Sequence, residues 1–243
     1  MMVDSGRMPR RVLHTSDFHL ESLGDRACDS LEALIELAGE TKVDLVIVAG
    51  DLFDRNNVDD NLVSFAVEQL KRLPVYVAIL PGNHDCLGPG SVLGREELWQ
   101  DGGNIRIFRE PGGETLDLPD LGVSLWGKPI ASYDSDVRPL VGIPRPEGNK
   151  QWHIAVAHGY YVGAEPPLFP SYHITQEEII TSGWDYIALG HLITFKYICR
   201  EPVKACYCGS PSLSGTVAIV DFAEETGVQV ARYSLLNKQY DMI

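Results

Sequence analysis

Three apolar stretches that alternate with two helical ones restrict the fold of this chain more than any other feature of its sequence. Residues 43–49 and 75–80 are almost wholly apolar and rich in β-branched side chains, which is typical of strands buried on both faces. Residues 11–15 predict an earlier strand, and apolar side chains at helical spacing predict helices over residues 27–38 and 62–73. The resulting β-α-β-α-β order indicates an α/β fold.

A short polar block follows each of these strands, and two similar blocks follow apolar runs later in the chain. The five blocks are Asp17-Phe18-His19, Gly50-Asp51-Leu52-Phe53-Asp54-Arg55, Gly82-Asn83-His84-Asp85, His158-Gly159 and Gly190-His191-Leu192-Ile193. Carboxylate, imidazole and amide groups are ligands of divalent metals such as Mn, Fe and Zn. Since open α/β sheets bind ligands at the carboxyl ends of their strands, the blocks predict one metal-bound active site.

The residue types within the blocks suggest separate roles. Asp17 and His19 are two positions apart at the end of an extended strand, so their side chains point the same way and can reach one ion. The two oxygens of Asp51 can bridge two metals, and Asn83 can bind one through its amide oxygen while His84 stays free for acid chemistry. Each block alone has an ordinary explanation, such as a turn at Asn83. Five such blocks at strand ends make coincidence improbable.

The rest of the chain predicts shorter elements within one domain. Thr175 with Glu178 three residues later is a capping box, which predicts the start of a helix. Loops are expected at 88–94 and 135–150. Further strands are expected at 104–108, 114–118, 123–126, 154–157 and 186–189, and a closing antiparallel set at 205–208, 217–222 and 228–234. We expect a flexible N-terminal leader over residues 1–10 and a single domain over residues 11–243.

Composition limits the kind of substrate and the compartment. Lys and Arg provide most of the affinity for nucleic acids, so a net charge of −14 disfavours a broad, sequence-independent DNA surface. Phosphate substrates stay compatible, because divalent cations can supply positive charge. Five cysteines without disulfide spacing indicate a reducing cytoplasm. The sequence has no signal-peptide core and no stretch near the ~20 apolar residues that cross a bilayer, so we expect a cytoplasmic protein without membrane contact.

The blocks taken together resemble the calcineurin-like metallophosphoesterase superfamily. Within it, the chain is similar to the branch of DNA repair exonucleases of the Mre11/SbcD type. The stretches that carry this closer resemblance are residues 12–20, residues 50–55, residues 185–192 and Gly209-Ser210-Pro211. The resemblance extends from Arg11 to Phe222. It implies an α/β fold of two facing mixed β-sheets flanked by helices, which is a four-layer sandwich.

The resemblance also implies two divalent metal ions, with Mn expected and Fe or Zn as alternatives. The first ion would be held by Asp17, His19 and Asp51, and the second by Asp51, Asn83, His158 and His191. His84 would act as the catalytic acid, and Asp85 would orient it. Asp54 matches a position near the site, where it could orient a ligand or the substrate, or else cap the next helix.

The activity that the resemblance implies is metal-dependent hydrolysis of phosphodiester bonds. A hydroxide that bridges the two ions would attack phosphorus in line. A nuclease-like enzyme would act on a phosphoester substrate such as a short nucleic acid, and family analogy alone suggests an ATPase partner subunit. Two alternatives stay open, which are a small-molecule phosphatase or phosphodiesterase and a weakly active metal-binding subunit of a larger assembly.

Two features depart from the family pattern. The last block of the family ends His-x-His, whereas this chain has Ile193 two residues after His191. The missing imidazole would belong to the first ion, which would keep three protein ligands and water. Nucleases of this type usually continue into a capping domain that grips DNA, and no capping domain is expected here because the sequence stops at Ile243.

The loss of one ligand predicts unequal occupancy of the two metal positions. We expect the first ion to bind more weakly than the second, because it has three protein ligands instead of four. Metal analysis of protein purified without added metal should find about one equivalent bound tightly. Two equivalents of equal affinity would contradict the expectation.

Overall fold

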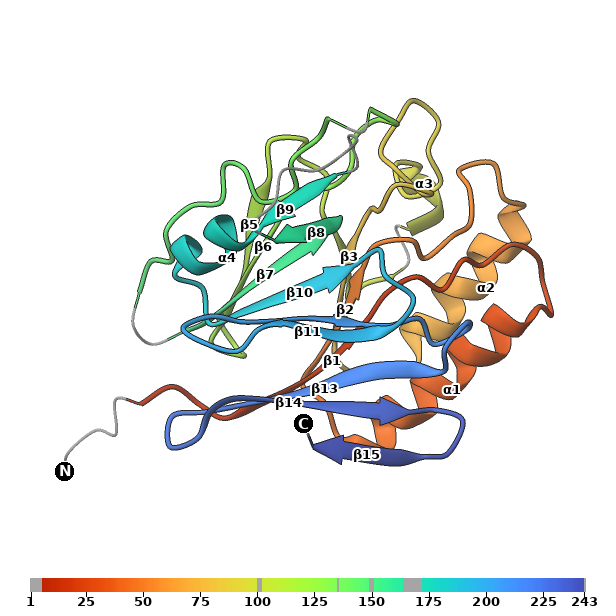
Figure 1. Cartoon of the computed structure of the whole chain (residues 1–243). Helices are drawn as coiled ribbons and strands as arrows, with labels where there is room; N and C mark the ends of the chain where they lie inside the picture. Colours follow the sequence, from red (N-terminus) through yellow and green to blue (C-terminus); the bar gives the residue numbers. More distant parts are fainter. Residues whose placement is uncertain (1–5, 100–101, 135, 149–150, 164–171, 243) are drawn as a thin grey trace.

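Two β-sheets lie face to face, with helices on their outer faces, in the computed structural model of the chain (Figure 1). The structure describes residues 6–99, 102–134, 136–148, 151–163 and 172–242. Helices α1 (Arg26–Thr41) and α2 (Asp60–Lys71) cover one sheet, with the short α3 (Glu96–Trp99) beside α2. Helix α4 (Gln176–Ser182) packs on the outer face of the other sheet. The expected four-layer α/β sandwich is therefore confirmed.

The first sheet has seven strands in the order β15-β14-β13-β1-β2-β3-β4. The four strands from β1 to β4 are parallel, and β13, β14 and β15 continue the sheet from β1 in antiparallel fashion. The bounds are β1 (Arg10–Thr15), β2 (Leu45–Ala49), β3 (Tyr76–Leu80), β4 (Ile105–Ile107), β13 (Thr216–Ala223), β14 (Gly227–Ser234) and β15 (Gln239–Met242). This sheet is therefore mixed, as expected.

The second sheet has six strands in the order β11-β12-β10-β7-β6-β5. Its four inner strands are parallel, and β11 and β5 are antiparallel edge strands. The bounds are β5 (Glu114–Leu118), β6 (Val123–Gly127), β7 (Trp152–His158), β10 (Tyr186–Gly190), β11 (Phe195–Cys199) and β12 (Lys204–Cys208). A small parallel pair, β8 (Tyr160–Gly163) and β9 (His173–Thr175), lies outside both sheets.

Strand β2 shows why the central strands are apolar on both faces. Leu45, Ile47 and Ala49 pack between the two sheets, whereas Val46 and Val48 pack beneath α1 and α2. Successive side chains of a strand point to opposite faces, so a strand with a core on each side needs an unbroken apolar run. The same alternation in β7 and β10 separates the core between the sheets from the one under α4.

Local capping explains where the helices begin. The side chain of Asp25 accepts a hydrogen bond from the main-chain N of Cys28 at the start of α1. Thr175 and Glu178 form the predicted capping box at the start of α4, with Glu178 Oε2 2.7 Å from the main-chain N of Thr175. None of the helices in the described ranges is long and apolar enough to cross a membrane.

The tail of the chain is divided between the sheets, which corrects the expectation of one closing antiparallel set. Strand β12 pairs in parallel with β10 in the second sheet, whereas β13 and β14 pair in the first. The edge strands β11 and β15 and the pair β8 and β9 were not expected from the sequence. These are short segments of three to five residues, and their pairing depends on distant partners.

Part of the N-terminal leader contacts the domain. The guanidinium of Arg7 lies over the Trp152 ring, and its Nη1 is 2.8 Å from Asp185 Oδ1. The indole N–H of Trp152 donates to the carbonyl of Met8 at 2.8 Å. Strand β1 already begins at Arg10, so the described part of the leader is held against the protein. Residues 1–5 lie outside the described residues.

The two sheets come into close contact at the carboxyl ends of β2 and β10. A Cβ atom added to Gly190 would lie 1.8 Å from the carbonyl oxygen of Ala49. His158, at the end of β7, also contacts this oxygen, with a distance of 2.8 Å to its Nδ1. The strand ends of both sheets therefore meet around one main-chain carbonyl, and position 190 has room only for a glycine.

This close approach predicts the stability of a matched pair of Gly→Ala variants. Gly190→Ala should lower the free energy of unfolding by about 2 kcal/mol or more, because the added carbon overlaps main-chain atoms that cannot move independently. Gly39→Ala should raise it by about 0.5–1 kcal/mol, because Gly39 lies inside α1 with nothing within 4 Å of an added Cβ. Urea unfolding followed by circular dichroism measures both, and equal stability of Gly190→Ala and wild type would contradict the steric argument.

Candidate metal centre

The loops after β1 and β2 run side by side and carry ligands from both strands. The main-chain N–H of Asp17 donates to the carbonyl of Gly50 at 3.0 Å, and that of His19 donates to the carbonyl of Asp51 at 3.1 Å. The ladder continues with Leu20 N donating to the carbonyl of Leu52 at 3.0 Å and Asp54 N donating to the carbonyl of Leu20 at 3.1 Å. These hydrogen bonds fix the loops relative to each other, so the side chains of Asp17, His19 and Asp51 share one location.

Four of the residues expected to bind metal have left-handed backbone conformations. The φ angles are 56° for Asp17, 54° for His19, 53° for Asp51 and 105° for His191. Such conformations cost non-glycine residues about 1–3 kcal/mol each, and they persist only where the surrounding structure enforces them. Their concentration at the strand ends indicates that the fold aims these side chains at a common point.

Three atoms of expected metal ligands converge on the side of the site formed by β3, β7 and β10. Asn83 Oδ1 lies 2.9 Å from His158 Nε2 and 3.0 Å from His191 Nδ1. The two imidazole nitrogens are 3.3 Å apart. Ligands that bind one ion at about 2.1 Å are separated by about 3.0–3.4 Å, so this triangle fits one face of a coordination sphere.

Asp51 lies between this triangle and the first pair of ligands. Its Oδ2 is 3.2 Å from His158 Nε2 and 3.9 Å from His19 Nε2. Its Oδ1 accepts a hydrogen bond from the main-chain N of His84 at 2.9 Å. His19 Nε2 is also 4.0 Å from Asp17 Oδ1. The central position of Asp51 is the one that a bridging carboxylate requires.

The His and Asp atoms that lie closest together in the structure form groups that differ from the two ligand sets expected from the sequence. Within the described ranges, two groups of His and Asp atoms lie close enough to hold an ion, which are Asp17, Asp51 and His158, and His19, Asp54 and His84. The six expected ligands nevertheless belong to one continuous cluster through the contacts of Asp51 and Asn83. Asp54 is the additional member that joins this cluster to His84.

The electrostatics of the cluster are those of a site that requires a cation. Burial raises the pKa of Asp17, and repulsion from Asp51 raises it further, although His158 acts in the opposite direction. Burial also disfavours the charged form of Asp51, but His158 outweighs this effect and holds the pKa of Asp51 below its usual range. In the described part of the chain, neither carboxylate has an ion pair with Lys or Arg.

A proton on His158 provides positive charge in this arrangement. Burial would lower the pKa of His158, but the charge of Asp51 and the contact with it raise the pKa to about 9. For His191, burial and the neighbouring His158 lower the pKa to about 4. A divalent ion would replace the proton of His158, since imidazole binds metal only in its neutral form. The donor set and the charge balance therefore both fit bound cations.

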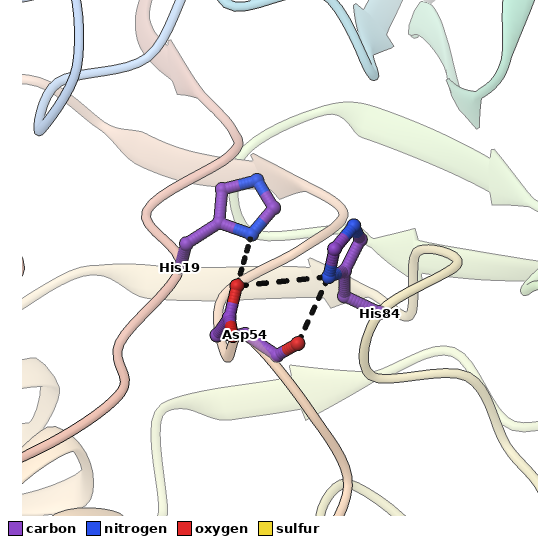
Figure 2. A group of neighbouring side chains, drawn as sticks. All are labelled: His19, Asp54 and His84. Carbon is purple, nitrogen blue, oxygen red and sulfur yellow. Dashed lines mark hydrogen bonds and ion pairs between the residues drawn. The ribbon is translucent and has the colours of Figure 1, made fainter.

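His84 differs from the expected ligands because its side chain is open to solvent. The side chain is 42% exposed, and its Nδ1 is 2.9 Å from the main-chain carbonyl oxygen of Asp54 (Figure 2). The Asp54 carboxylate lies between the two imidazoles, with Oδ1 3.2 Å from His19 Nδ1 and 3.7 Å from His84 Nδ1. The His19 and His84 rings meet edge to face with their centroids 4.6 Å apart. His84 thus borders the cluster with its Nε2 free of these contacts.

Asp85 is placed differently from the expectation that it orients His84. Its carboxylate is fully buried and accepts three main-chain hydrogen bonds, from Gly82 N at 2.7 Å, Leu52 N at 2.8 Å and Phe53 N at 3.2 Å. Burial and the charge of Asp51 raise the pKa of Asp85 to about 7. Asp85 therefore ties the loop after β3 to the loop after β2, and the contact that orients His84 comes from Asp54.

Two histidines and a tryptophan outside the cluster make structural contacts instead. His14 is fully buried, with Nδ1 2.7 Å from the hydroxyl of Tyr186. His153 contacts the carbonyl of Glu147 at 2.8 Å, away from the cluster. Trp184 is buried in the core, and its indole N–H donates to a main-chain carbonyl.

Ile193 stands where the family has its second histidine, and its side chain is 46% exposed. In the described ranges, the two groups that could hold an ion include two side chains from outside the expected ligand set, Asp54 and His84. These two are therefore the ionisable side chains that could compensate for the missing imidazole. The sequence did not assign a role to Ser16, whose hydroxyl donates to Asp17 Oδ2. Its position directly before Asp17 was visible, but a hydrogen bond between adjacent side chains has no sequence pattern of its own.

Comparisons with known proteins place this geometry in a family. The chain is 28% identical over 222 residues to the uncharacterized metallophosphoesterase YhaO of Bacillus subtilis, covering 82% of this chain and 52% of that protein. It is 35% identical over 202 residues to the DNA double-strand break repair protein Mre11 of Saccharolobus solfataricus, covering 76% of this chain and 49% of that protein. The chain thus spans about half the length of these relatives.

The fold has counterparts among solved structures. Purple acid phosphatase PPD1 from yellow lupin superposes with a TM-score of 0.67 at 12% identity, covering 99% of this chain and 54% of that one. At this identity the likeness concerns the fold alone. The profile of the calcineurin-like phosphoesterases matches residues 10–195, which is most of the sequence. The chain therefore belongs to the calcineurin-like phosphoesterase family.

Proposed function

We propose that this protein is a metal-dependent phosphodiesterase with two divalent ions, Mn being the expected metal. The observation that carries the proposal is the exposed imidazole of His84 beside a buried cluster of carboxylate, imidazole and amide groups. A merely structural metal site has no need of an unligated imidazole at its edge. Membership of the family supports hydrolysis of phosphoesters, and the similarity to Mre11 supports diesters as the substrate class.

The residues have distinct roles in this proposal. Asp17, His19 and Asp51 would hold the first ion, and Asp51, Asn83, His158 and His191 the second. When bound, two such ions would neutralise phosphoryl oxygens and make water a nucleophile near neutral pH. His84 would donate a proton to the leaving oxygen through Nε2, since its Nδ1–H donates to the carbonyl of Asp54.

The charge around the cluster favours a small substrate. Several arginines of the described chain form ion pairs away from the cluster, such as Arg95 with Asp60 and Arg138 with Glu178. Combined with a net charge of −14, this arrangement offers little to grip a long polyanion. We therefore propose a short nucleic acid or a small phosphodiester as the substrate.

The proposal extends to partners and compartment. One relative, from Bacillus subtilis, is named as a component of the two-part nuclease SbcCD, and the chain is 26% identical to it over 242 residues. This similarity supports a partner subunit, for which an ATPase is the candidate by family analogy. All five cysteines are buried free thiols, which supports a reducing cytoplasm as the compartment.

An activity panel with added Mn²⁺ tests the proposed reaction. Its substrates are bis-p-nitrophenyl phosphate, p-nitrophenyl phosphate, single-stranded DNA and a 2′,3′-cyclic nucleotide. We expect diester hydrolysis, with kcat lowered by about 100-fold or more in His84→Ala because the proton donor is lost. Mn²⁺ binding should be retained in this variant.

The matched control is His173→Ala, which removes a histidine of β9 that belongs to neither metal-binding group. Its kcat should equal that of the wild type. Hydrolysis of the monoester alone would identify a phosphatase instead. No turnover with Mn²⁺, Fe²⁺ or Zn²⁺ would refute the proposed enzyme and support a metal-binding subunit.

The contact between Asp54 and His19 predicts an effect on metal affinity. The Asp54 carboxylate contacts His19 Nδ1 at 3.2 Å, and the opposite ring nitrogen, Nε2, lies towards Asp17 and Asp51. Asp54→Ala should weaken binding of the first ion by about tenfold in a Mn²⁺ titration followed by electron paramagnetic resonance. Asp60→Ala is the control, because Asp60 pairs with Arg95 on the surface. Equal affinities in both variants would exclude this role for Asp54.

A further inference from the structure

The loop between β12 and β13 contains a serine motif to which the proposed reaction assigns no role. Gly209-Ser210-Pro211 is one of the stretches that resemble the nuclease branch, and it lies directly behind the loop that carries Asp17 and His19. Ser210 is fully buried and Ser212 is 4% exposed. Two buried hydroxyl groups therefore face the ligand loop from the side opposite to solvent.

The two hydroxyls bind consecutive carbonyl groups of the ligand loop. Ser210 Oγ donates to the carbonyl of Asp17 at 2.6 Å, and Ser212 Oγ donates to the carbonyl of Phe18 at 2.7 Å. A hydroxyl has one proton, so each donor is used entirely by its carbonyl. Ser210 Oγ also accepts from the main-chain N of Leu213 at 3.1 Å, which fixes the hydroxyl within its own loop.

These carbonyls belong to the peptide groups on either side of Phe18. Asp17 and His19, which flank it, both have left-handed backbone conformations, and both side chains face the first ion's position. The orientation of the two peptide groups determines where these side chains point. A pair of buried donors that holds both carbonyls therefore opposes relaxation of the loop to ordinary φ angles.

Ser210 also contacts the position where the family ligand is missing. Its main-chain N–H donates to the carbonyl of Ile193 at 3.0 Å, while its hydroxyl binds the carbonyl of Asp17. The same residue thus joins the segment that lacks an imidazole to the segment that supplies the remaining ligands. With one ligand fewer, binding of the first ion depends more on how well the other side chains are held in place.

We infer that Ser210 and Ser212 are positioning residues that set the affinity of the first metal ion. They act through the main chain of Asp17 and Phe18 and do not touch the ion. The inference rests on the two-ion site proposed above. It concerns the first ion only, because Asn83, His158 and His191 come from other loops.

Mn²⁺ titration followed by electron paramagnetic resonance tests the inference in the full chain. His19→Ala identifies the weaker binding class, because it removes a ligand of the first ion. Ser210→Ala and Ser212→Ala should each weaken this class by about tenfold and leave the tighter class within about twofold of wild type. The Mn²⁺ concentration for half-maximal diester hydrolysis should rise in parallel, while kcat at saturating Mn²⁺ recovers to at least about half of wild type.

Ser214→Ala is the matched control within the same loop. Its hydroxyl donates to the carbonyl of Ser210 at 2.9 Å, accepts from the main-chain N of Ser210 at 3.2 Å and contacts Thr216, so its hydrogen bonds lie within its own loop and do not include the carbonyls of Asp17 and Phe18. This variant should bind both ions as the wild type does. If Ser210→Ala fails to fold by circular dichroism, Ser212→Ala carries the test, because the Ser212 hydroxyl contacts only the carbonyl of Phe18 and, at 3.1 Å, Ser210 Oγ among the described residues.

Three results would overturn the inference. Unchanged affinities in both serine variants would exclude a positioning role, and equal weakening of both classes would show general destabilisation. Either result would leave the proposed phosphodiesterase standing. Absence of Mn²⁺ binding in the wild type would remove the two-ion proposal and this inference together.

Discussion

The geometry of the site depends on contacts made by the main-chain carbonyl group of Ala49. It ends β2 in one sheet, accepts from His158 at the end of β7 in the other, and lies against the α-carbon of Gly190. Facing sheets usually stand about 10 Å apart, so contact between main-chain atoms of the two sheets is a strong local constraint. Because the sheets meet here, ligands from five strand ends reach one another without long side chains.

The second constraint on the site is electrostatic. Two carboxylates, Asp17 and Asp51, are buried beside each other, and the described chain gives them histidines but no Lys or Arg as ionic partners. Burying such charges is unfavourable unless opposite charge accompanies them. The fold tolerates the arrangement because rigid loops and main-chain donors hold it, and bound cations would relieve it. The same rigid arrangement of carboxylates and imidazoles is suited to holding a cation.

Sequence patterns were sufficient for the elements that carry the site, whereas the two facing sheets were expected from the family resemblance. Strands β1, β2 and β3 are apolar runs with cores on both faces, so their identity depends on local pattern alone. The separation of β12 from β13 into different sheets was not predictable, because it depends on pairing between strands far apart in the chain. Asp85 was misjudged for a related reason. Residues adjacent in sequence point in different directions in a turn, and the direction follows from backbone angles that residue type does not specify.

The way His84 is held has a consequence for how this site could vary during evolution. Its ring is oriented by the main-chain oxygen of Asp54, whereas His19 is oriented by the carboxylate of the same residue. A substitution at position 54 replaces the carboxylate but keeps the oxygen. Such a substitution would remove the nearest contact of His19 Nδ1 and leave the main-chain contact of His84, so position 54 can affect the two imidazoles to different degrees.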